Sequence, residues 1–402
     1  MKPSSVTIRL KPGRDRPVAH GHPWIFSGAI AETQGEPAVG AVADVFSADG
    51  GWLARGLLHP EAALAVRLYT WRQDQALDSA FFTARVEAAL ALRERLFGDA
   101  ETREKTNAYR LVFSESDGLS GLIVDRYADV LAVQVGAAAL APYLGDMIEH
   151  LRKRTQVSQA HVSADPDDVR REKFDPTTLP CGLAADSPPV RIRENGFLFD
   201  VDLRSGQKTG FFLDQRVNRQ RVAAYARGRR MLSAYCYAGA FEVYAAAGGA
   251  AEIVGLDRSE SALDLARGAH ELNGTKVPCE YTKADVPEAL RRFRDAGRTF
   301  DLIVLDPPRF VASREQITKG LRAYKDINLL AMKLLSPGGI LATFSCSGQV
   351  ALQDFRTVVG WASNDSQRNV RILETLSQPP DHPILAVVPE TEYLKGLICW
   401  VE

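Results

Sequence analysis

Cysteine is scarce and scattered in this sequence. The 402-residue chain has five cysteines, they form no C-x-x-C pair, and their number is odd: Cys181, Cys236, Cys279, Cys346 and Cys399. Such spacing favours neither a disulfide framework nor a zinc site. We therefore expect free thiols, no bound metal and a reducing, cytoplasmic environment.

Long apolar runs and an excess of charge are also missing. Residues 130–144 are too short and too interrupted to span a bilayer, and residues 1–16 are polar and basic without an apolar leader segment. The 49 basic and 50 acidic residues give a formal net charge of -1. We expect a protein that is neither exported nor membrane-bound, and any nucleic-acid site must be a local basic patch.

The chain is too long for a single hydrophobic core, which stops growing at roughly 250–300 residues. Changes in the sequence pattern predict three domains, at residues 1–73, 74–189 and 190–402. The first combines short strands with dense turn signals, including a hairpin over residues 42–55, and predicts a small β-barrel. Its aromatic residues Trp24, Phe26 and Trp52 stand beside basic groups and could stack RNA bases, or equally fill the barrel core.

The second domain reads as a small α+β module. Apolar residues recur at helical spacing over residues 78–97, with Asp78 as the expected cap and an exposed loop after the helix. Three strands are predicted at 109–113, 121–126 and 130–135, followed by a helix over 142–152. Residues 165–189 are rich in Asp and Pro and predict a linker.

The third domain opens with a hairpin around the turn Glu194-Asn195-Gly196. After residue 228, strands and helices alternate regularly, which predicts a doubly wound α/β domain with a parallel sheet between two helical layers. The expected strands cover residues 231–236, 252–256, 279–283, 300–305 and 340–345, with a closing pair at 372–375 and 396–401. Helices are expected to start near residues 240, 259, 287 and 317.

Three of these strand ends carry residues typical of an adenosine-containing cofactor. Tyr237 and Gly239 lie in a tight turn after the first strand, and Asp257 follows 18 positions after Gly239, near the spacing at which an acidic residue binds ribose hydroxyls. Asp285 ends the third strand and could accept a hydrogen bond from an adenine amino group. Alternatively, Asp285 caps the helix that follows it.

The fourth strand ends in Asp306-Pro307-Pro308-Arg309-Phe310. Proline restricts the residue before it, so Asp306 is held in a rigid loop at the sheet edge where open α/β sheets bind ligands. A planar group is expected there, although a plain strand followed by a proline turn is equally consistent with the tripeptide. Nicotinamide enzymes share the glycine turn and the ribose carboxylate, whereas this loop favours S-adenosylmethionine methyltransferases.

Two more segments complete the predicted site. Cys346 lies between two serines at the end of the fifth strand, where backbone N–H groups could favour its thiolate, and the other cysteines are expected to be inert. The loop 206–216 has glycines, a lysine, a threonine and phenylalanines that could line a ligand cleft or merely connect two elements. Its candidate cofactor-binding residues are Lys208, Thr209, Phe211 and Asp214.

These motifs, together with residues 322–328, resemble those of the bacterial 23S ribosomal RNA cytosine-C5 methyltransferases of the RlmI type. The resemblance covers nearly the whole chain. It implies an N-terminal PUA barrel, a middle α+β module and a class I methyltransferase domain that uses S-adenosylmethionine. It also implies large-subunit ribosomal RNA as the partner, and a homodimer.

The resemblance further implies that a Cys346 thiolate adds to C6 of a cytosine, so that C5 can accept the methyl group. Asp306 would bind the polar edge of the base as well as the cofactor, and Pro307, Pro308 and Phe310 would line the base pocket. Arg216, Arg219 and Arg221 would hold the RNA backbone. Two alternatives remain open: an N-methyltransferase acting on an exocyclic amine, which needs no nucleophile, and a catalytically inert RNA-binding assembly factor.

Overall fold

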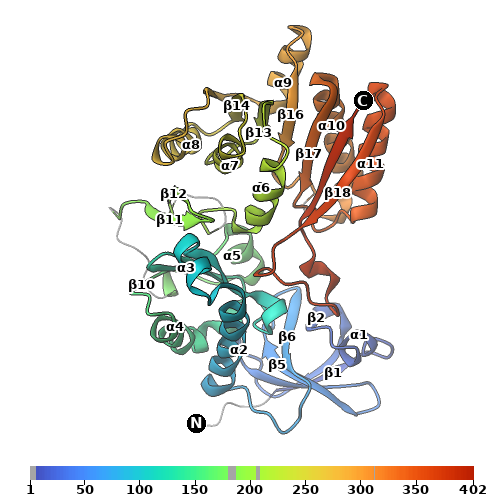
Figure 1. Cartoon of the computed structure of the whole chain (residues 1–402). Coiled ribbons are helices and arrows are strands. Elements are labelled where there is room, and N and C mark those ends of the chain that lie inside the picture. Colours follow the sequence, from blue (N-terminus) through green and yellow to red (C-terminus); the bar gives the residue numbers. More distant parts are fainter. Residues whose placement is uncertain (1–5, 180–186, 205–208, 312) are drawn as a thin grey trace. The chain divides into compact units, whose positions relative to one another are not determined.

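The structure is a computed structural model of the chain (Figure 1), and it describes residues 6–179, 187–204, 209–311 and 313–402. Its contacts divide the chain into two compact units. Unit 1 comprises Met1–Val190, Asp202–Gly210 and Pro380–Thr391, and unit 2 comprises Arg191–Val201, Phe211–Pro379 and Glu392–Glu402. Each unit is thus assembled from separate segments of the chain. The three-domain division drawn from the sequence stays a prediction.

The N-terminal part of unit 1 is a six-stranded sheet with the order β2-β6-β5-β4-β1-β3. The strands are β1 (Val6–Leu10), β2 (Trp24–Phe26), β3 (Ile30–Gln34), β4 (Val42–Phe46), β5 (Trp52–Leu58) and β6 (Leu64–Thr70), with a short helix α1 (Arg16–Ala19). Alternate residues of β1 are buried in a shared core, as the period of a strand requires. The predicted hairpin is confirmed by the antiparallel pairing of β4 and β5.

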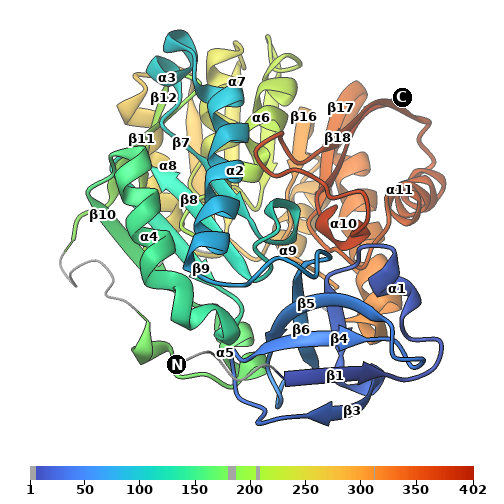
Figure 2. The ribbon, with the colours of Figure 1, turned by 90° about the horizontal axis from the view of Figure 1, so that it is seen from below.

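The second part of unit 1 is a four-stranded sheet with the order β10-β9-β8-β7, covered by α2 and α4 (Figure 2). Its strands are β7 (Ala108–Phe113), β8 (Leu122–Tyr127), β9 (Val130–Val135) and β10 (Gln159–Ser163). Its helices are α2 (Ser79–Phe97), α3 (Ala100–Lys105), α4 (Ala141–Thr155) and α5 (Pro166–Glu172). The Asp78 carboxylate accepts a hydrogen bond of 2.8 Å from the Phe81 amide, which confirms the predicted helix cap.

Two sequence predictions in this part were wrong. The expected loop after residue 97 contains helix α3, which Asp99 caps. The expected linker begins with helix α5, because Asp165 caps it and Pro166 occupies its first position. Glu172, at the end of α5, is buried and forms an ion pair of 2.6 Å with Arg67, so this stretch packs into unit 1.

Unit 2 contains a seven-stranded sheet with the order β15-β14-β13-β16-β17-β19-β18. The strands are β13 (Arg230–Ala234), β14 (Glu252–Asp257), β15 (Cys279–Lys283), β16 (Phe300–Leu305), β17 (Leu335–Ser345), β18 (Val370–Ser377) and β19 (Lys395–Val401). The first five strands run parallel, and β19 is antiparallel to both of its neighbours. The chain builds outward from β13 to β15 and then returns to place β16 on the other side of β13, which creates a topological switch point.

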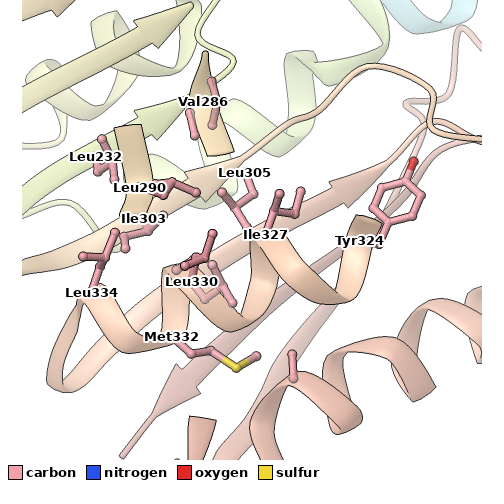
Figure 3. Packing of buried hydrophobic residues seen from close by; sticks show 14 of the residues in the cluster. Leu232, Val286, Leu290, Ile303, Leu305, Tyr324, Ile327, Leu330, Met332 and Leu334 are labelled. Atoms are coloured by element: carbon pink, nitrogen blue, oxygen red, sulfur yellow. The ribbon is translucent and has the colours of Figure 1, made fainter. Parts of the chain in front are cut away.

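Helices cover both faces of this sheet. One face carries α6 (Arg216–Ala223), α7 (Ala240–Ala247) and α8 (Glu260–Leu272), and the other carries α9 (Val286–Asp295), α10 (Ile317–Leu334) and α11 (Leu352–Ser366). Successive strand residues point to opposite faces, so Met231 packs toward α6 and α7 whereas Leu232 packs toward α9 and α10. Figure 3 shows Leu232, Ile303 and Leu305 against Ile327 and Leu330 of α10. The doubly wound prediction is confirmed, although the sequence did not indicate α11.

The predicted hairpin forms from β11 (Val190–Glu194) and β12 (Phe197–Val201). Asn195 and Gly196 have φ angles of +51° and +89°, as its tight turn requires.

Candidate active site

Four candidate segments meet at the carboxyl edge of the unit 2 sheet. Parallel pairing aligns Ala234 with Leu256 and Leu305, and Leu305 with Thr343. The segments that follow these strands therefore emerge side by side. The structure brings together the turn at residues 235–239, Asp257, Asp306 and Cys346 at the switch point.

The turn after β13 is conformationally strained. Tyr235, Tyr237 and Gly239 have φ angles of +66°, +47° and +73°, a region that residues other than glycine seldom adopt. A Cβ atom at Gly239 would lie 2.8 Å from the Cβ of Ala266 and 3.1 Å from the hydroxyl of Tyr281, so only glycine fits there. The sequence therefore places a tight, preformed turn at the position of the expected cofactor.

Asp257 ties this turn to the end of β14. Its carboxylate accepts hydrogen bonds of 3.0 Å from the Tyr237 amide and 3.0 Å from the Ser259 amide. The side chain stays half-exposed with its orientation fixed. Each carboxylate oxygen can accept a further hydrogen bond, so Asp257 keeps the capacity to bind hydroxyl groups.

Asp285 caps helix α9, as the alternative prediction for this residue states. Its Oδ1 accepts a hydrogen bond of 3.3 Å from the Glu288 amide. The side chain remains exposed. Capping therefore does not prevent contact with a ligand, and the predicted cofactor role stays a prediction.

Asp306 is held by a relay of amide side chains that the sequence analysis did not single out. Gln215, in the short helical turn η5 (Leu213–Gln215), donates a hydrogen bond of 3.0 Å to Oδ1 of Asp306. Asn218 donates one of 2.6 Å to the side-chain oxygen of Gln215. The sequence feature that could have indicated Gln215 is its position within the motif 206–216.

The remaining residues of the Asp-Pro-Pro loop differ in exposure. Pro307 is buried and Pro308 is exposed, whereas Phe310 is half-buried. The Phe310 ring packs against Tyr324 of α10, with 4.8 Å between ring centroids. Gly320 of α10 lets the end of this loop lie close to the helix, because a Cβ there would lie 2.2 Å from a methyl group of Val311. The base-pocket role of these three residues stays a prediction.

Cys346 faces the Asp-Pro-Pro loop. Its Sγ lies 3.9 Å from the carbonyl oxygen of Pro307, and the residue is half-buried. The neighbouring Ser347 anchors the segment, because its hydroxyl bonds Tyr324 at 2.9 Å and accepts from the Val311 amide at 3.2 Å. The thiol is thus held beside the loop that contains Asp306.

Lys395 is a buried cation beside this cysteine, and sequence reasoning missed it. Its ammonium group donates hydrogen bonds of 2.8 Å to the Ser347 carbonyl and 2.9 Å to the Tyr393 carbonyl. Burial lowers the pKa of Lys395 to about 8, and the charges of Glu392 and Cys346 oppose that shift. The only signal in the sequence was a lysine at the start of an apolar strand.

The other cysteines are less suited to act as nucleophiles. Burial raises the pKa values of Cys279 and Cys399 to about 12 and also raises the pKa of Cys236. High pKa values keep these thiols protonated and unreactive. Cys181 lies outside the described residues. Among the residues that the structure describes, no group of side chains suits a metal ion.

The predicted cofactor loop is divided between the units. Lys208 lies outside the described residues. Thr209 belongs to unit 1, where its hydroxyl donates a hydrogen bond of 2.6 Å to Asp125. In unit 2, the buried Phe211 ring lies under the Arg219 guanidinium, and Asp214 accepts a hydrogen bond of 2.6 Å from the Tyr393 hydroxyl. Their cofactor roles stay predictions.

The arginines expected to hold RNA do not form one exposed set. Arg219 is 3% exposed and forms an ion pair of 2.6 Å with Glu194, and Arg216 is also buried. The prediction was wrong for these two residues, because they lie on the buried side of α6. Arg221 is exposed and pairs with Glu374 at 2.7 Å.

Two protein-family models match the chain. The profile of the family described as S-adenosylmethionine-dependent methyltransferase matches residues 145–398, and that of a PUA-like domain matches residues 8–71. Among the residues described, no helix is both long and apolar enough to cross a bilayer.

Two relatives match over nearly their whole length. The chain is 41% identical over 399 residues to ribosomal RNA large subunit methyltransferase I of Shewanella denitrificans, which covers 99% of this chain and 100% of the relative. It is 40% identical over 401 residues to the protein of the same name from Erwinia tasmaniensis, with the same coverage. Among solved structures, the crystal structure of SMU.776 complexed with SAH matches with a TM-score of 0.83 at 19% identity, over 98% of this chain and 99% of that one. This last match shows the fold alone.

Proposed function

The chain belongs to the family of the ribosomal RNA large subunit methyltransferases I, and we propose that it methylates C5 of a cytidine in 23S ribosomal RNA through a covalent Cys346 adduct. S-adenosylmethionine is the methyl donor of this family. Two further expectations belong to the same proposal: a homodimer, which rests on the family resemblance, and a cytoplasmic location, which rests on the scattered cysteines.

One observation carries the proposal: a half-exposed thiol and a half-exposed carboxylate stand at adjacent strand ends. Cys346 follows β17 and Asp306 follows the neighbouring β16, and the thiol lies 3.9 Å from the carbonyl oxygen of Pro307. Methyl transfer to an exocyclic amine needs the carboxylate but no thiol. The presence of both the thiol and the carboxylate, each held by its own contacts, favours a mechanism in which the thiol attacks a ring carbon of the base.

The residues at the sheet edge fit the cofactor. Asp257 offers remaining acceptor positions for ribose hydroxyls, exposed Asp285 offers one for an adenine amino group, and the Gly239 turn has no room for a side chain. When bound, S-adenosylmethionine supplies an electrophilic sulfonium methyl group. We assign Asp257, Asp285, Tyr237 and Gly239 to its adenosine half, with Asp306, Phe211 and Asp214 nearer the reacting groups.

The chain's own residues account for the activation of the base. The Cys346 thiolate adds to C6 of the cytosine, the π electrons of the C5–C6 bond move through C4 to N3, and Asp306 in its neutral form donates a proton to N3. C5 then carries enamine character and can accept the methyl group. Loss of the C5 proton to solvent restores the C5–C6 double bond and expels Cys346 as thiolate. The N3 proton then returns to Asp306, so the enzyme is unchanged.

A Cys346→Ala substitution tests the mechanism, with Cys279→Ala as the matched control. We expect Cys346→Ala to lose at least about 10³-fold of methyl transfer to 23S ribosomal RNA while its calorimetric affinity for S-adenosylhomocysteine is unchanged. Cys279→Ala should keep its activity, because that thiol is held protonated. Mass spectrometry of nucleosides should show 5-methylcytidine as the product.

Covalent trapping separates the C5 mechanism from the alternatives. RNA containing 5-fluorocytidine cannot lose its C5 substituent, so the wild-type enzyme should form a stable adduct that Cys346→Ala does not form. Full activity of Cys346→Ala with an N-methylated product would establish the amine methyltransferase instead. Absence of binding to S-adenosylmethionine would favour an inert assembly factor.

A further inference from the structure

Unit 1 contains a cavity that no step of the proposed reaction uses. Its volume is about 480 Å³, within the usual range for small-molecule sites. It lies between the end of β6, one face of α2, the helical turn η2 (Ser114–Asp117) and residues 385–387. All of these segments belong to unit 1.

Arg85 of α2 brings an uncompensated positive charge to this cavity. Its guanidinium stacks on the Phe81 ring at 5.1 Å and donates a hydrogen bond of 3.2 Å to the Tyr69 carbonyl. Within the described part of the chain, no carboxylate lies within ion-pair distance of Arg85. Partial burial disfavours the charged form and lowers the pKa of the Arg85 guanidinium. Acceptor atoms of a ligand would compensate this charge.

A hydrogen-bond acceptor lies in the same cavity. Oε1 of Glu115 accepts hydrogen bonds from the Trp24 indole at 2.9 Å and the Ser120 hydroxyl at 2.6 Å, whereas Oε2 accepts none from the described residues. Asp117 differs, because it already accepts bonds from Arg93 and the Phe113 amide at 2.6 Å each. Glu115 is thus the carboxylate with capacity for a ligand.

The Trp71 ring and the apolar side chain of Val387 line this cavity. The Trp71 indole donates a hydrogen bond of 2.7 Å to the Val18 carbonyl, which fixes the ring while 38% of the residue stays exposed. Val387, 47% exposed, lines the same cavity. An exposed, rigid aromatic ring beside apolar side chains is the arrangement on which unstacked bases pack.

We propose that this cavity binds the base of an unpaired guanosine in the RNA substrate. The inference rests on the RNA substrate of the proposed function, but not on the mechanism by which that RNA is methylated. Guanine presents N–H donors on its Watson–Crick edge for Glu115 and the acceptors O6 and N7 for Arg85. Its ring would stack on Trp71. The site would anchor the RNA in unit 1 while a different nucleotide is methylated in unit 2.

Fluorescence anisotropy with labelled ten-nucleotide RNAs tests the proposal. The probes are oligouridine and the same oligomer with one central guanosine, and wild-type protein should bind the guanosine probe at least about fivefold more tightly. Ala88→Phe, which fills the cavity from an exposed position on α2, and Arg85→Met should both remove this preference. Ala91→Phe, exposed on the same helix but outside the cavity, should keep it.

The controls distinguish a failure of the guanosine site from a failure of the proposed methylation mechanism. All variants should retain their melting temperature and their affinity for S-adenosylhomocysteine, and Cys346→Ala should bind both probes as the wild type does. A failed methylation mechanism would therefore leave this result intact. Equal binding of the two probes by the wild type, or a guanosine preference that survives in Ala88→Phe, would overturn the proposal.

Discussion

The side chain of Lys395 lies almost entirely out of solvent, and its ammonium group binds two backbone carbonyl oxygens at the end of the sheet. One of them belongs to Ser347, the residue after Cys346. A lysine in this place holds the strand end and adds a positive charge near the thiol. With a pKa lowered to about 8, that charge is present at neutral pH and is lost as the pH rises through 8.

Lys395→Met should therefore reduce the thiolate fraction of Cys346 at neutral pH. We expect alkylation of Cys346 by iodoacetamide at pH 7 to slow by up to about tenfold and its pH midpoint to move upward, because the stabilising cation is gone. Peptide mass spectrometry measures the rate. Lys333→Met, which removes an exposed lysine from α10, serves as the control and should change nothing. An unshifted midpoint in Lys395→Met would limit Lys395 to a purely structural role.

Glu242, in the first turn of α7, is a fully buried carboxyl group. Burial raises its pKa to about 7 from 4.5. The folded state therefore binds the proton more tightly than the unfolded state. Its contribution to stability is fully present below pH 4.5 and is lost as the pH rises through 7, by roughly 3 kcal/mol in total.

Glu242→Gln should remove this loss, because an amide does not ionise. We expect the melting temperature of the variant to exceed that of the wild type at pH 8.5 by roughly 5–10 °C, and to match it closely at about pH 4. Scanning calorimetry at both pH values measures the difference. Glu260→Gln, at the exposed start of α8, changes the charge equally without burial and should show no such pH dependence. A constant offset for Glu242→Gln would contradict the raised pKa.

At the scale of elements, a buried ion pair joins the β11–β12 hairpin to α6. Glu194 ends β11 and Arg219 lies on α6, with 2.6 Å between their charged atoms and 3% or less of either side chain exposed. The Tyr244 hydroxyl donates a further hydrogen bond of 3.0 Å to Glu194. The attraction between the two charges offsets the free-energy cost of removing each of them from water, and this offset is lost when either charge is removed.

Arg219→Met should leave the Glu194 charge buried and unpaired, and so lower the free energy of unfolding by about 3–5 kcal/mol. The double variant Glu194→Gln with Arg219→Met should recover a large part of that loss, since no buried charge remains. Urea denaturation followed by circular dichroism provides the values. Additive losses in the double variant would argue against a coupled pair.

At the scale of the whole molecule, the chain forms two compact units, and unit 2 carries the turn at residues 235–239, Asp257, Asp306 and Cys346. A ligand that binds only the folded form of one unit stabilises that unit. We expect two calorimetric transitions, with S-adenosylhomocysteine raising only the one that Arg219→Met lowers. If both transitions rise together, residues of unit 1 such as Thr209 also contribute to cofactor binding.

Much of the fold could be predicted because the signals were local. Strand β16 and the capped start of α2 were identified from apolar runs and from Asp78, and the positive φ values at Asn195 and Gly196 follow from the turn they form. Helices α3 and α5 could not be predicted from apolar periodicity, because they are short and mostly polar, and only their caps Asp99 and Asp165 indicate them.

The sequence by itself determined which functional residues follow the predicted strands. These residues are a glycine turn, three carboxylates and a thiol, each at the end of one strand. These depend on residue type and periodicity, which are properties of neighbouring residues in the chain. Only the tertiary structure decided which arginines on α6 are buried, that Gln215 holds Asp306, and that Lys395 lies beside Cys346. Those contacts join residues far apart in the sequence, so they exist only once the chain has packed.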